Sequence, residues 1–474
     1  MKLIKKLGQE TLIYGTSTII ARLLNFCLVP LYTYFLVTSE YGIVAAVFSF
    51  LALFNVIYQY GMDQAYLRFT SDHQQDKEES FSTAYFSVLC TSVLLSLLIV
   101  CTAPLWAKLI GIGPYFSYLI KLSAAVLFLD ALTVIPFAKL RLQHRAWRFV
   151  TVRTTAIVTN VAFNIYFLAT TSYGVKGIFY ASIIASSAAL LLLLPVIKED
   201  LRLKFSKELL RKMLKFAWPF VPSGMASILV NVIDKPLLVF LTGLSAVGVY
   251  QANFKIGVFM MLIVSMFDQA WRPFFLQHAK EPYAKPLFAQ VLNYFTAFSM
   301  WVALGLGFLM PVIIRTPIFG HYFIHPNYWY GLNIIPFVMA GYFFYGIYIN
   351  FIVAPVITKK TGILMYATIL GAIVSVATNI FLVPKVGLLG AGSAIMLSYI
   401  SMAVTMFIFT QKNYPIPYQY NKLLALALTG TLAIAANCYF NTLTAKIVIL
   451  ILFPLIAFKI VYVKKDFFDH VTIK

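Results

Sequence analysis

Charged residues are scarce in this chain, and acidic ones most of all. Only 11% of its 474 residues are charged and 61% are hydrophobic, with 16 acidic against 37 basic side chains. A soluble domain is about 25% charged, so a soluble enzyme and a disordered chain are both excluded. The net charge of +21 does not indicate nucleic acid as a partner, because too little polar surface exists to hold a duplex. We expect the basic residues to lie at the ends of membrane spans, on the anionic cytoplasmic side.

Cysteines are few and the common catalytic motifs are missing. The four cysteines lie in apolar runs without a CxxC pair: Cys27, Cys90, Cys101 and Cys438. That pattern argues against a disulfide framework, a zinc ribbon and thioredoxin chemistry. The sequence also contains no Walker A loop, no serine elbow and no HExxH motif. We therefore expect transport rather than an enzymatic reaction, with no metal and no bound cofactor.

Long hydrophobic runs dominate what is present, and the mean hydropathy is +0.85. A spanning helix needs about 20 mostly apolar residues, and the loops between the runs are too short for an extramembrane domain. The first run is too long for a signal peptide, so we expect it to be retained as a helix. About fourteen runs are long enough to span, and they lie near residues 11–35, 43–65, 82–106, 116–138, 150–170, 176–197, 215–240, 246–270, 287–310, 331–354, 362–383, 387–410, 421–439 and 443–462.

The distribution of lysine and arginine predicts the orientation. Most of them fall in alternate loops, beginning with the N-terminal segment, as the positive-inside rule requires of cytoplasmic segments. An odd number of spans would break this alternation in one half of the chain. We therefore expect both termini to be cytoplasmic.

An internal repeat relates the two halves of the chain. The tetrapeptide Asp63-Gln64-Ala65-Tyr66 returns as Asp268-Gln269-Ala270-Trp271, and Gly42 is matched by Gly248. Six predicted helices separate the copies, and an even number gives both the same orientation, which predicts parallel repeats. Later matches keep the same order: Val161-Ala162-Phe163-Asn164-Ile165 with Val376-Ala377-Thr378-Asn379-Ile380, and Gly174-x-x-Gly177 with Gly387-x-x-Gly390.

The repeat predicts the domain organisation. We expect residues 1–200 to form an N-lobe of six spans and residues 201–412 to form a C-lobe of six spans. Residues 413–474 would add two spans and a cytoplasmic C-terminus. The strongly basic segment 198–215 would link the lobes.

Two pairs of local motifs stand out beside the repeat: Val29-Pro30-Leu31-Tyr32 with Ser39-Glu40-Tyr41-Gly42, and Asn379-Ile380-Phe381-Leu382-Val383-Pro384 with Gly387-Leu388-Leu389-Gly390-Ala391. In these motifs the sequence resembles the polysaccharide branch of the multidrug/oligosaccharidyl-lipid/polysaccharide exporter superfamily. The resemblance implies an all-α membrane protein with two lobes in a V, like the multidrug exporters. It also implies a Wzx-type flippase of the bacterial inner membrane, which moves undecaprenyl-diphosphate-linked oligosaccharides by alternating access. The implied partners are this lipid-linked glycan, membrane lipids, and the glycosyltransferases, polymerase and chain-length regulator of one pathway.

Cations at membrane depth are costly and are candidates for function. Three lie in predicted spans, each with an amide three or four positions away on the same helix face. Arginine and lysine suit a diphosphate, and amides suit sugar hydroxyls. The substrate-binding candidates are Arg22 with Asn25, Asn231 with Lys235, and Gln251 with Lys255. That their helices line a central cavity is implied by the resemblance alone. Lys255 snorkelling to an interface and Lys235 in a local ion pair are the alternatives.

Four aspartates are candidates for ion coupling or gating: Asp63, Asp130, Asp234 and Asp268. For Asp63 and Asp268 the alternative is a structural role, at helix ends or paired with Arg68 and Arg272. Because no nucleotide site is present, energy would come from a proton or sodium gradient or from the membrane potential. Arg141, Arg145 and Arg148 would collect the anionic substrate at the cytoplasmic side, or would only set the topology.

Three other functions stay open from the sequence. A multidrug cation antiporter of the same fold is disfavoured, because cationic cargo suits carboxylates rather than basic groups. A flippase for the peptidoglycan lipid precursor is the nearer alternative. A membrane glycosyltransferase or polymerase is the third, although the longest outer loop, about residues 311–330, has no carboxylate.

Overall fold

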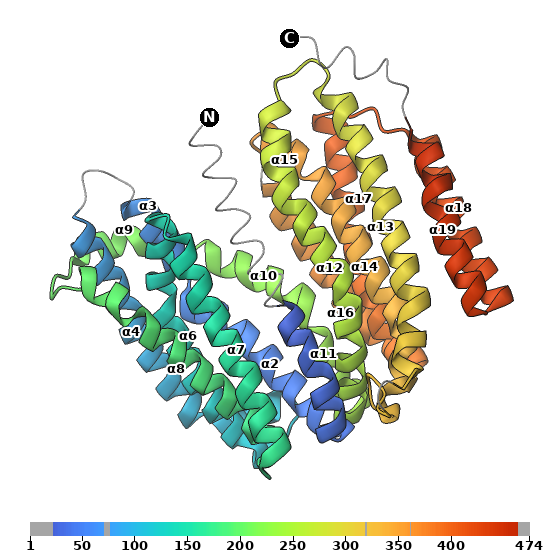
Figure 1. Ribbon diagram of the computed structural model, residues 1–474. Coiled ribbons are helices and arrows are strands. Elements are labelled where there is room, and N and C mark those ends of the chain that lie inside the picture. The colour runs from blue at the N-terminus through green and yellow to red at the C-terminus, as the bar shows by residue number, and fades with distance from the viewer. Residues whose placement is uncertain (1–21, 71–75, 318–319, 361, 463–474) are drawn as a thin grey trace. The chain divides into compact units, whose positions relative to one another are not determined.

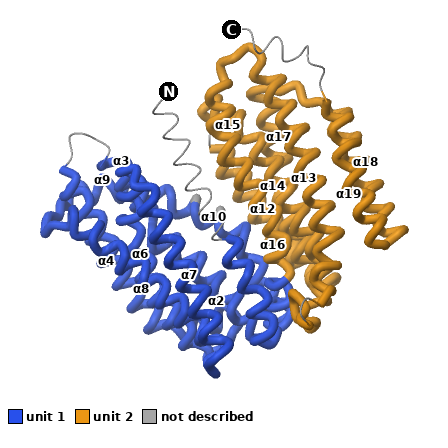
Figure 2. The backbone as a smooth tube through the Cα atoms, in the orientation of Figure 1, with its two compact units in different colours: residues 1–252 blue, residues 253–474 orange. Residues whose placement is uncertain are grey.

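The computed structural model describes residues 22–70, 76–317, 320–360 and 362–462, and these are helical almost throughout, without a β-strand (Figure 1). The helices form two compact units, residues 1–252 (unit 1) and residues 253–474 (unit 2) (Figure 2). After a helical segment at residues 22–35, unit 1 contains α2 (Thr38–Gln59), α3 (Met62–Thr70), α4 (Lys77–Cys101), α5 (Ala103–Leu109), η1 (Pro114–Phe116), α6 (Ser117–Leu142), α7 (Ala146–Thr170), α8 (Val175–Asp200), α9 (Lys207–Ala217), α10 (Phe220–Val232) and α11 (Asp234–Thr242).

Helix α12 (Leu244–His278) begins in unit 1 and continues into unit 2. The remaining elements belong to unit 2: α13 (Ala284–Arg315), η2 (Pro326–Ile334), α14 (Ile335–Phe351), α15 (Val353–Ile357), α16 (Gly362–Val386), α17 (Leu388–Asn413), α18 (Tyr420–Phe440) and α19 (Leu443–Val461). The sequence repeat predicts a boundary near residue 200, whereas the compact units meet within α12, because α9, α10 and α11 pack against α2, α3 and α4.

Eleven stretches of the described residues are long and apolar enough to cross a membrane, which confirms a multi-pass, all-α membrane fold. The other three predicted spans have visible reasons for falling outside that set. The run 11–35 is described only from residue 22, and α7 carries arginines, threonines and asparagines along its length. The run 215–240 is divided at Ile233 into the short helices α10 and α11. The total of fourteen spans stays a prediction.

Two helix hairpins show the repeat in detail. The turn between α7 and α8 and the turn between α16 and α17 each place a glycine with positive φ before the second helix, Gly174 at 49° and Gly387 at 60°. The matched glycines one turn later, Gly177 and Gly390, leave no room for a Cβ, because the preceding helix lies against them. The sequence match therefore reflects one turn-and-packing motif that is used twice.

Helices α2 and α12 cross at their N-terminal ends within unit 1. A Cβ on Gly42 would meet the carbonyl oxygen of Leu244, and a Cβ on Gly248 would meet the carbonyl oxygen of Thr38. The hydroxyls of Thr38 and Ser245 share a hydrogen bond of 2.5 Å beside this crossing. The contact is reciprocal, because each repeat-matched glycine receives a carbonyl from the other helix, and only glycine permits so close an approach.

The last two helices belong to unit 2 and pack on α13. Apolar side chains from the three helices form one buried cluster, which includes Phe308, Leu426 and Phe453. Gln290 on α13 donates to the carbonyl oxygen of Val461 at 3.0 Å, which fixes the end of α19. The segment predicted as a separate pair of spans is thus held by both apolar and polar contacts.

Candidate functional site

A line of hydrogen-bonded polar side chains connects three helical segments of unit 1. The Tyr32 hydroxyl donates to Oδ1 of Asn164 at 2.9 Å, and Asn164 Nδ2 donates to Oδ1 of Asn160 at 3.0 Å. Asn160 Nδ2 lies 3.4 Å from the hydroxyl oxygen of Ser182 on α8. Asn164 is fully buried. Buried amides are stable in such a place only when they are hydrogen-bonded, and this line supplies the partners.

A separate hydrogen bond connects Asp130 on α6 to α8. Ser186 lies one helical turn beyond Ser182, and its hydroxyl donates to Oδ1 of Asp130 at 2.6 Å. Arg153 on α7 interacts electrostatically with this carboxylate, and its guanidinium lies over the ring of Phe137, 5.3 Å from the centroid. A carboxylate in a candidate membrane span that is hydrogen-bonded to a hydroxyl has the chemistry to exchange a proton.

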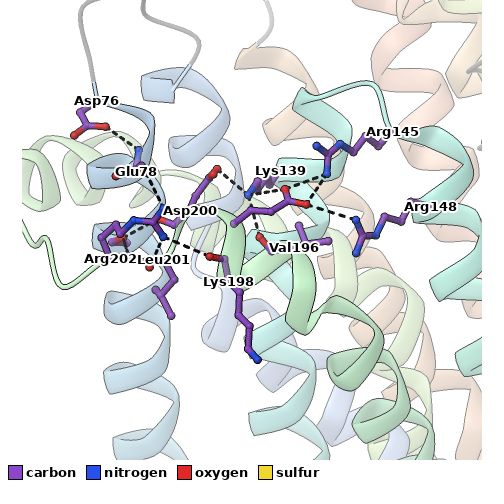
Figure 3. Close-up of polar contacts among 12 residues, drawn as sticks. Asp76, Glu78, Lys139, Arg145, Arg148, Val196, Lys198, Asp200, Leu201 and Arg202 are labelled. Atoms are coloured by element: carbon purple, nitrogen blue, oxygen red, sulfur yellow. Dashed lines mark hydrogen bonds and ion pairs between the residues drawn. The ribbon is translucent and has the colours of Figure 1, made fainter.

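Near the C-terminal end of α8, unit 1 contains a buried lysine that is surrounded by carboxylate and carbonyl oxygens (Figure 3). Lys139 Nζ lies 2.8 Å from Oδ2 of Asp200 and 3.3 Å from Oε2 of Glu199. It also donates to the carbonyl oxygen of Val196 at 2.9 Å and lies 5.1 Å from the centroid of the Phe81 ring. The Lys139 side chain is 1% exposed. Its ammonium is thus compensated on several sides, which a buried charge requires.

The arginines predicted to collect substrate lie around this cluster, and each has a carboxylate partner. Arg145 lies 2.9 Å from Oε1 of Glu199 and Arg148 lies 3.6 Å from the same oxygen, while Arg141 lies 3.2 Å from Oδ2 of Asp63. Their side chains are 35–42% exposed. A guanidinium has five N–H donors, so these pairs leave donors for an anion from solution.

A second buried ion pair lies where α10 breaks into α11. Lys235 Nζ lies 3.1 Å from Oδ1 of Asp234, and it also donates to the carbonyl oxygen of Asn231 at 3.3 Å. The hydroxyl of Tyr250 on α12 donates to Oδ2 of Asp234 at 2.5 Å. Both members of the ion pair are buried, with 1% and 7% of the two side chains exposed. The local ion pair, which the sequence left open for Lys235, is thus present.

The remaining cation and amide candidates lie on two elements. Arg22 is half-buried and Asn25 exposed on the first helical segment. Gln251 and Lys255 are both half-buried on α12, Gln251 in unit 1 and Lys255 in unit 2. Among the described residues, Oε1 of Gln251 is a buried acceptor without a hydrogen-bond donor, so this helix face offers an unsatisfied polar atom.

The aspartates Asp63 and Asp268 are both in ion pairs. Arg272 Nε lies 2.7 Å from Oδ1 of Asp268, one turn along α12, as the spacing predicts. Asp63 pairs with Arg141 on α6 and accepts from Gln64 Nε2 at 2.7 Å. Within the described ranges, no three His, Cys, Asp or Glu side chains come together as a metal site.

Sequence reasoning missed the partners of these groups rather than the groups themselves. Neither Lys139 nor Tyr250 is among the candidates that the sequence indicates. A signal for Lys139 was available, because the acidic pair Glu199-Asp200 ends a span predicted to finish on the same side of the membrane. Ser186 and Asn160 carried no such signal, since serine and asparagine are common in membrane helices.

Comparison with known proteins gives a family match and several solved structures of similar fold. The family described as "Polysaccharide biosynthesis protein" matches residues 7–278. The fold is similar to that of lipid II flippase MurJ in an inward closed conformation, with 18% identity, a TM-score of 0.75, and coverage of 97% of this chain and 99% of that one. It is also similar to an inward-facing multidrug resistance MATE transporter of the MOP superfamily, with 14% identity, a TM-score of 0.61, and coverage of 83% and 94%. A mutant of the Vibrio cholerae MATE transporter VcmN gives 13% identity, a TM-score of 0.62, and coverage of 87% and 97%.

A search of curated proteins finds no significant match. At these identities the structural likeness shows the fold, which confirms the MATE- and MOP-like architecture that the sequence resemblance implies. The family match covers more than half of the 474 residues, and the protein therefore belongs to the polysaccharide biosynthesis protein family.

Proposed function

We propose that this protein is a flippase that moves an undecaprenyl-diphosphate-linked oligosaccharide across the bacterial inner membrane, from the cytoplasmic leaflet to the outer one. The observation that carries the proposal is the polysaccharide biosynthesis family match together with a fold shared over 97% of the chain with a protein named as a lipid II flippase. The MATE transporters share the fold over 83% and 87% of the chain, so the lipid flippase accounts for more of its length. Both termini would be cytoplasmic.

The cationic candidates are proposed to hold the diphosphate. Arg22 and Lys255 would contact the phosphate oxygens, with Asn25, Asn231, Lys235 and Gln251 contributing to the polar surface that binds the sugars. The exposed donors of Arg141, Arg145 and Arg148 would gather the anionic headgroup from the cytoplasmic side. Substrate transport would proceed by alternating access between two lobes.

The energy source is proposed to be a proton or sodium gradient or the membrane potential. Asp130 is the carboxylate best suited to this role, because it lies in a candidate membrane span and its hydrogen-bond donor there is the neutral hydroxyl of Ser186. Asp63, Asp234 and Asp268 each have a cationic partner and would serve as gating or structural groups. The proposed pathway partners are the glycosyltransferases, polymerase and chain-length regulator that make and use the lipid-linked glycan.

The decisive experiment uses a strain that lacks this protein and keeps its glycosyltransferases. Lipid-linked oligosaccharide is measured on the cytoplasmic face of spheroplasts, after supply of wild type, Arg22→Gln, Lys255→Gln or the exposed control Lys385→Gln. Wild type and control should clear the intermediate. Each site variant should clear it at least about tenfold more slowly, because a charge-assisted hydrogen bond contributes about 1.5–3 kcal/mol. If nothing accumulates without the protein, the flippase proposal fails; if all variants clear it equally, only the site assignment fails.

A flippase for the peptidoglycan lipid precursor is the second candidate, favoured by the TM-score of 0.75 to the lipid II flippase. The two are separated by genetic rescue. Expression of this protein in cells depleted of their own precursor flippase should not restore growth if its cargo is a polysaccharide unit. Restored growth would assign the precursor as cargo instead.

A further inference from the structure

The segment between α8 and α10 contains a short amphipathic helix with one buried face and one exposed face. Helix α9 packs on α3 and α4 (Figure 1). Its buried side chains are Leu209, Met213 and Ala217. These residues are four apart and therefore lie on one helix face, so the opposite face of the helix is left exposed.

Two rows of different chemistry lie side by side on that surface. Lys207, Arg211 and Lys215 are spaced by four, are all exposed, and make no ion pair among the described residues. The neighbouring row contains Leu214, 41% exposed, and Trp218, 70% exposed; Trp218 follows the helix with helical backbone angles. A row of cations beside a row of large apolar side chains is typical of helices that lie in a membrane interface.

The other cations of the segment are already engaged, which isolates this row. Lys212 pairs with Glu208 one turn away at 2.6 Å. Arg202 pairs with Glu78 at 3.1 Å, and Lys204 pairs with Asp76 at 2.9 Å. The cation row thus keeps its charge available to a partner outside the protein.

The orientation of α9 is fixed by its connection to α4. The backbone N–H of Arg202 donates to the hydroxyl of Ser82 at 2.9 Å, and that of Ser206 donates to Thr83 at 3.2 Å. Ser206 also caps α9 by accepting from the N–H of Leu209 at 3.3 Å. The helix is therefore held with its cation row facing outward, without needing a partner to form it.

We infer that α9 lies on the membrane surface and binds anionic phospholipid headgroups through Lys207, Arg211 and Lys215, while Leu214 and Trp218 enter the acyl boundary. Charge complementarity selects the partner, because a row of three exposed cations without an ion pair in the described ranges suits a leaflet that carries anionic lipid. The apolar row selects a lipid surface over a soluble acidic protein, since lysine and arginine stems extend to the headgroups while leucine and tryptophan lie deeper. This contact is separate from the transport site and does not depend on the cargo.

The test is hydrogen–deuterium exchange of the full-length protein in nanodiscs of phosphatidylcholine, with or without phosphatidylglycerol. Amides of residues 207–218 should exchange at least about fivefold more slowly with the anionic lipid, the factor that a single cation contributes near such a surface. Added salt should reduce the difference. Lys207→Gln/Arg211→Gln/Lys215→Gln should abolish it, and Leu214→Ser/Trp218→Ser should weaken it.

A matched control tests whether the lipid effect depends on the position of the cations rather than on their number. Lys108→Gln/Lys121→Gln/Lys385→Gln removes three exposed cations elsewhere and should keep the full lipid effect, and unchanged exchange in α4 and α6 reports that each variant is folded. Equal exchange in the two lipids overturns the inference and favours a soluble acidic partner. A lipid effect that survives loss of the cation row also overturns it.

Discussion

Replacing Lys139 by methionine is expected to lower the free energy of unfolding by about 2–3 kcal/mol. Removing one member of a buried ion pair costs about 3–5 kcal/mol, because the other charge is left uncompensated. Here the two carboxylates left behind are 35% and 24% exposed and Glu199 keeps Arg145, so water and Arg145 compensate part of their charge and the cost falls to about 2–3 kcal/mol, just below that range. Methionine keeps the volume of the lysine stem, so little packing is lost.

The measurement is equilibrium unfolding of the purified protein in mixed micelles of mild and denaturing detergent. Lys212→Met is the matched control, because it breaks an ion pair whose lysine is 53% exposed, and exposed pairs contribute little. The double variant Lys139→Met/Asp200→Asn should recover part of the loss, since it removes one of the stranded charges. An equal effect of Lys139→Met and Lys212→Met would refute the reasoning, and so would a double variant no more stable than the single one.

Three further outcomes follow from the described contacts. Gly248→Ala should prevent the close crossing of α2 and α12, because its Cβ would meet the carbonyl oxygen of Thr38. The variant should unfold at a lower fraction of the denaturing detergent than wild type, and unchanged stability would contradict the crossing. Tyr250→Phe removes the hydrogen bond to Asp234 and should cost about 1–3 kcal/mol in the same assay, whereas no change would mean that the carboxylate does not need it. The hydrogen bond from Lys204 lowers the pKa of Asp76. The stabilisation from this pair is therefore complete above the usual carboxyl pKa of about 4 and is lost as the pH falls through the lowered pKa. The stability of Asp76→Asn should respond less to acid than that of wild type, and parallel pH profiles of the two proteins would exclude the contribution.

Features that depend on local sequence were predictable. The apolar runs follow from bilayer thickness, and the ion pair between Asp268 and Arg272 follows from their spacing on one helix. The glycine matches predicted the repeat correctly because glycine is required where φ is positive or backbones meet, as at Gly174 and Gly387. These constraints act within one helix or one turn.

Contacts between distant helices were not predictable from one sequence. Asn164 accepts from Tyr32, which lies 132 positions earlier, and no spacing rule joins two such residues. The break at Ile233 was not predicted, because the run 215–240 was taken as one span although Asp234, Lys235 and Pro236 interrupt its apolar residues directly after that position. Asp130 was identified as a candidate by its depth alone, and only the packing of α6 on α8 shows that Ser186 is its donor.

The crossing of α2 and α12 has the form of an isologous interface. In a two-fold symmetric dimer, residue i of one subunit meets residue j of the other and the reverse contact is also made. Here the carbonyl at Thr38 meets Gly248, and the carbonyl at Leu244 meets Gly42. Each repeat thus carries both the carbonyl and the glycine that the contact needs. A chain of half this length, present in two copies, would contain the same crossing, so the geometry is compatible with a homodimeric ancestor that was later fused into one polypeptide.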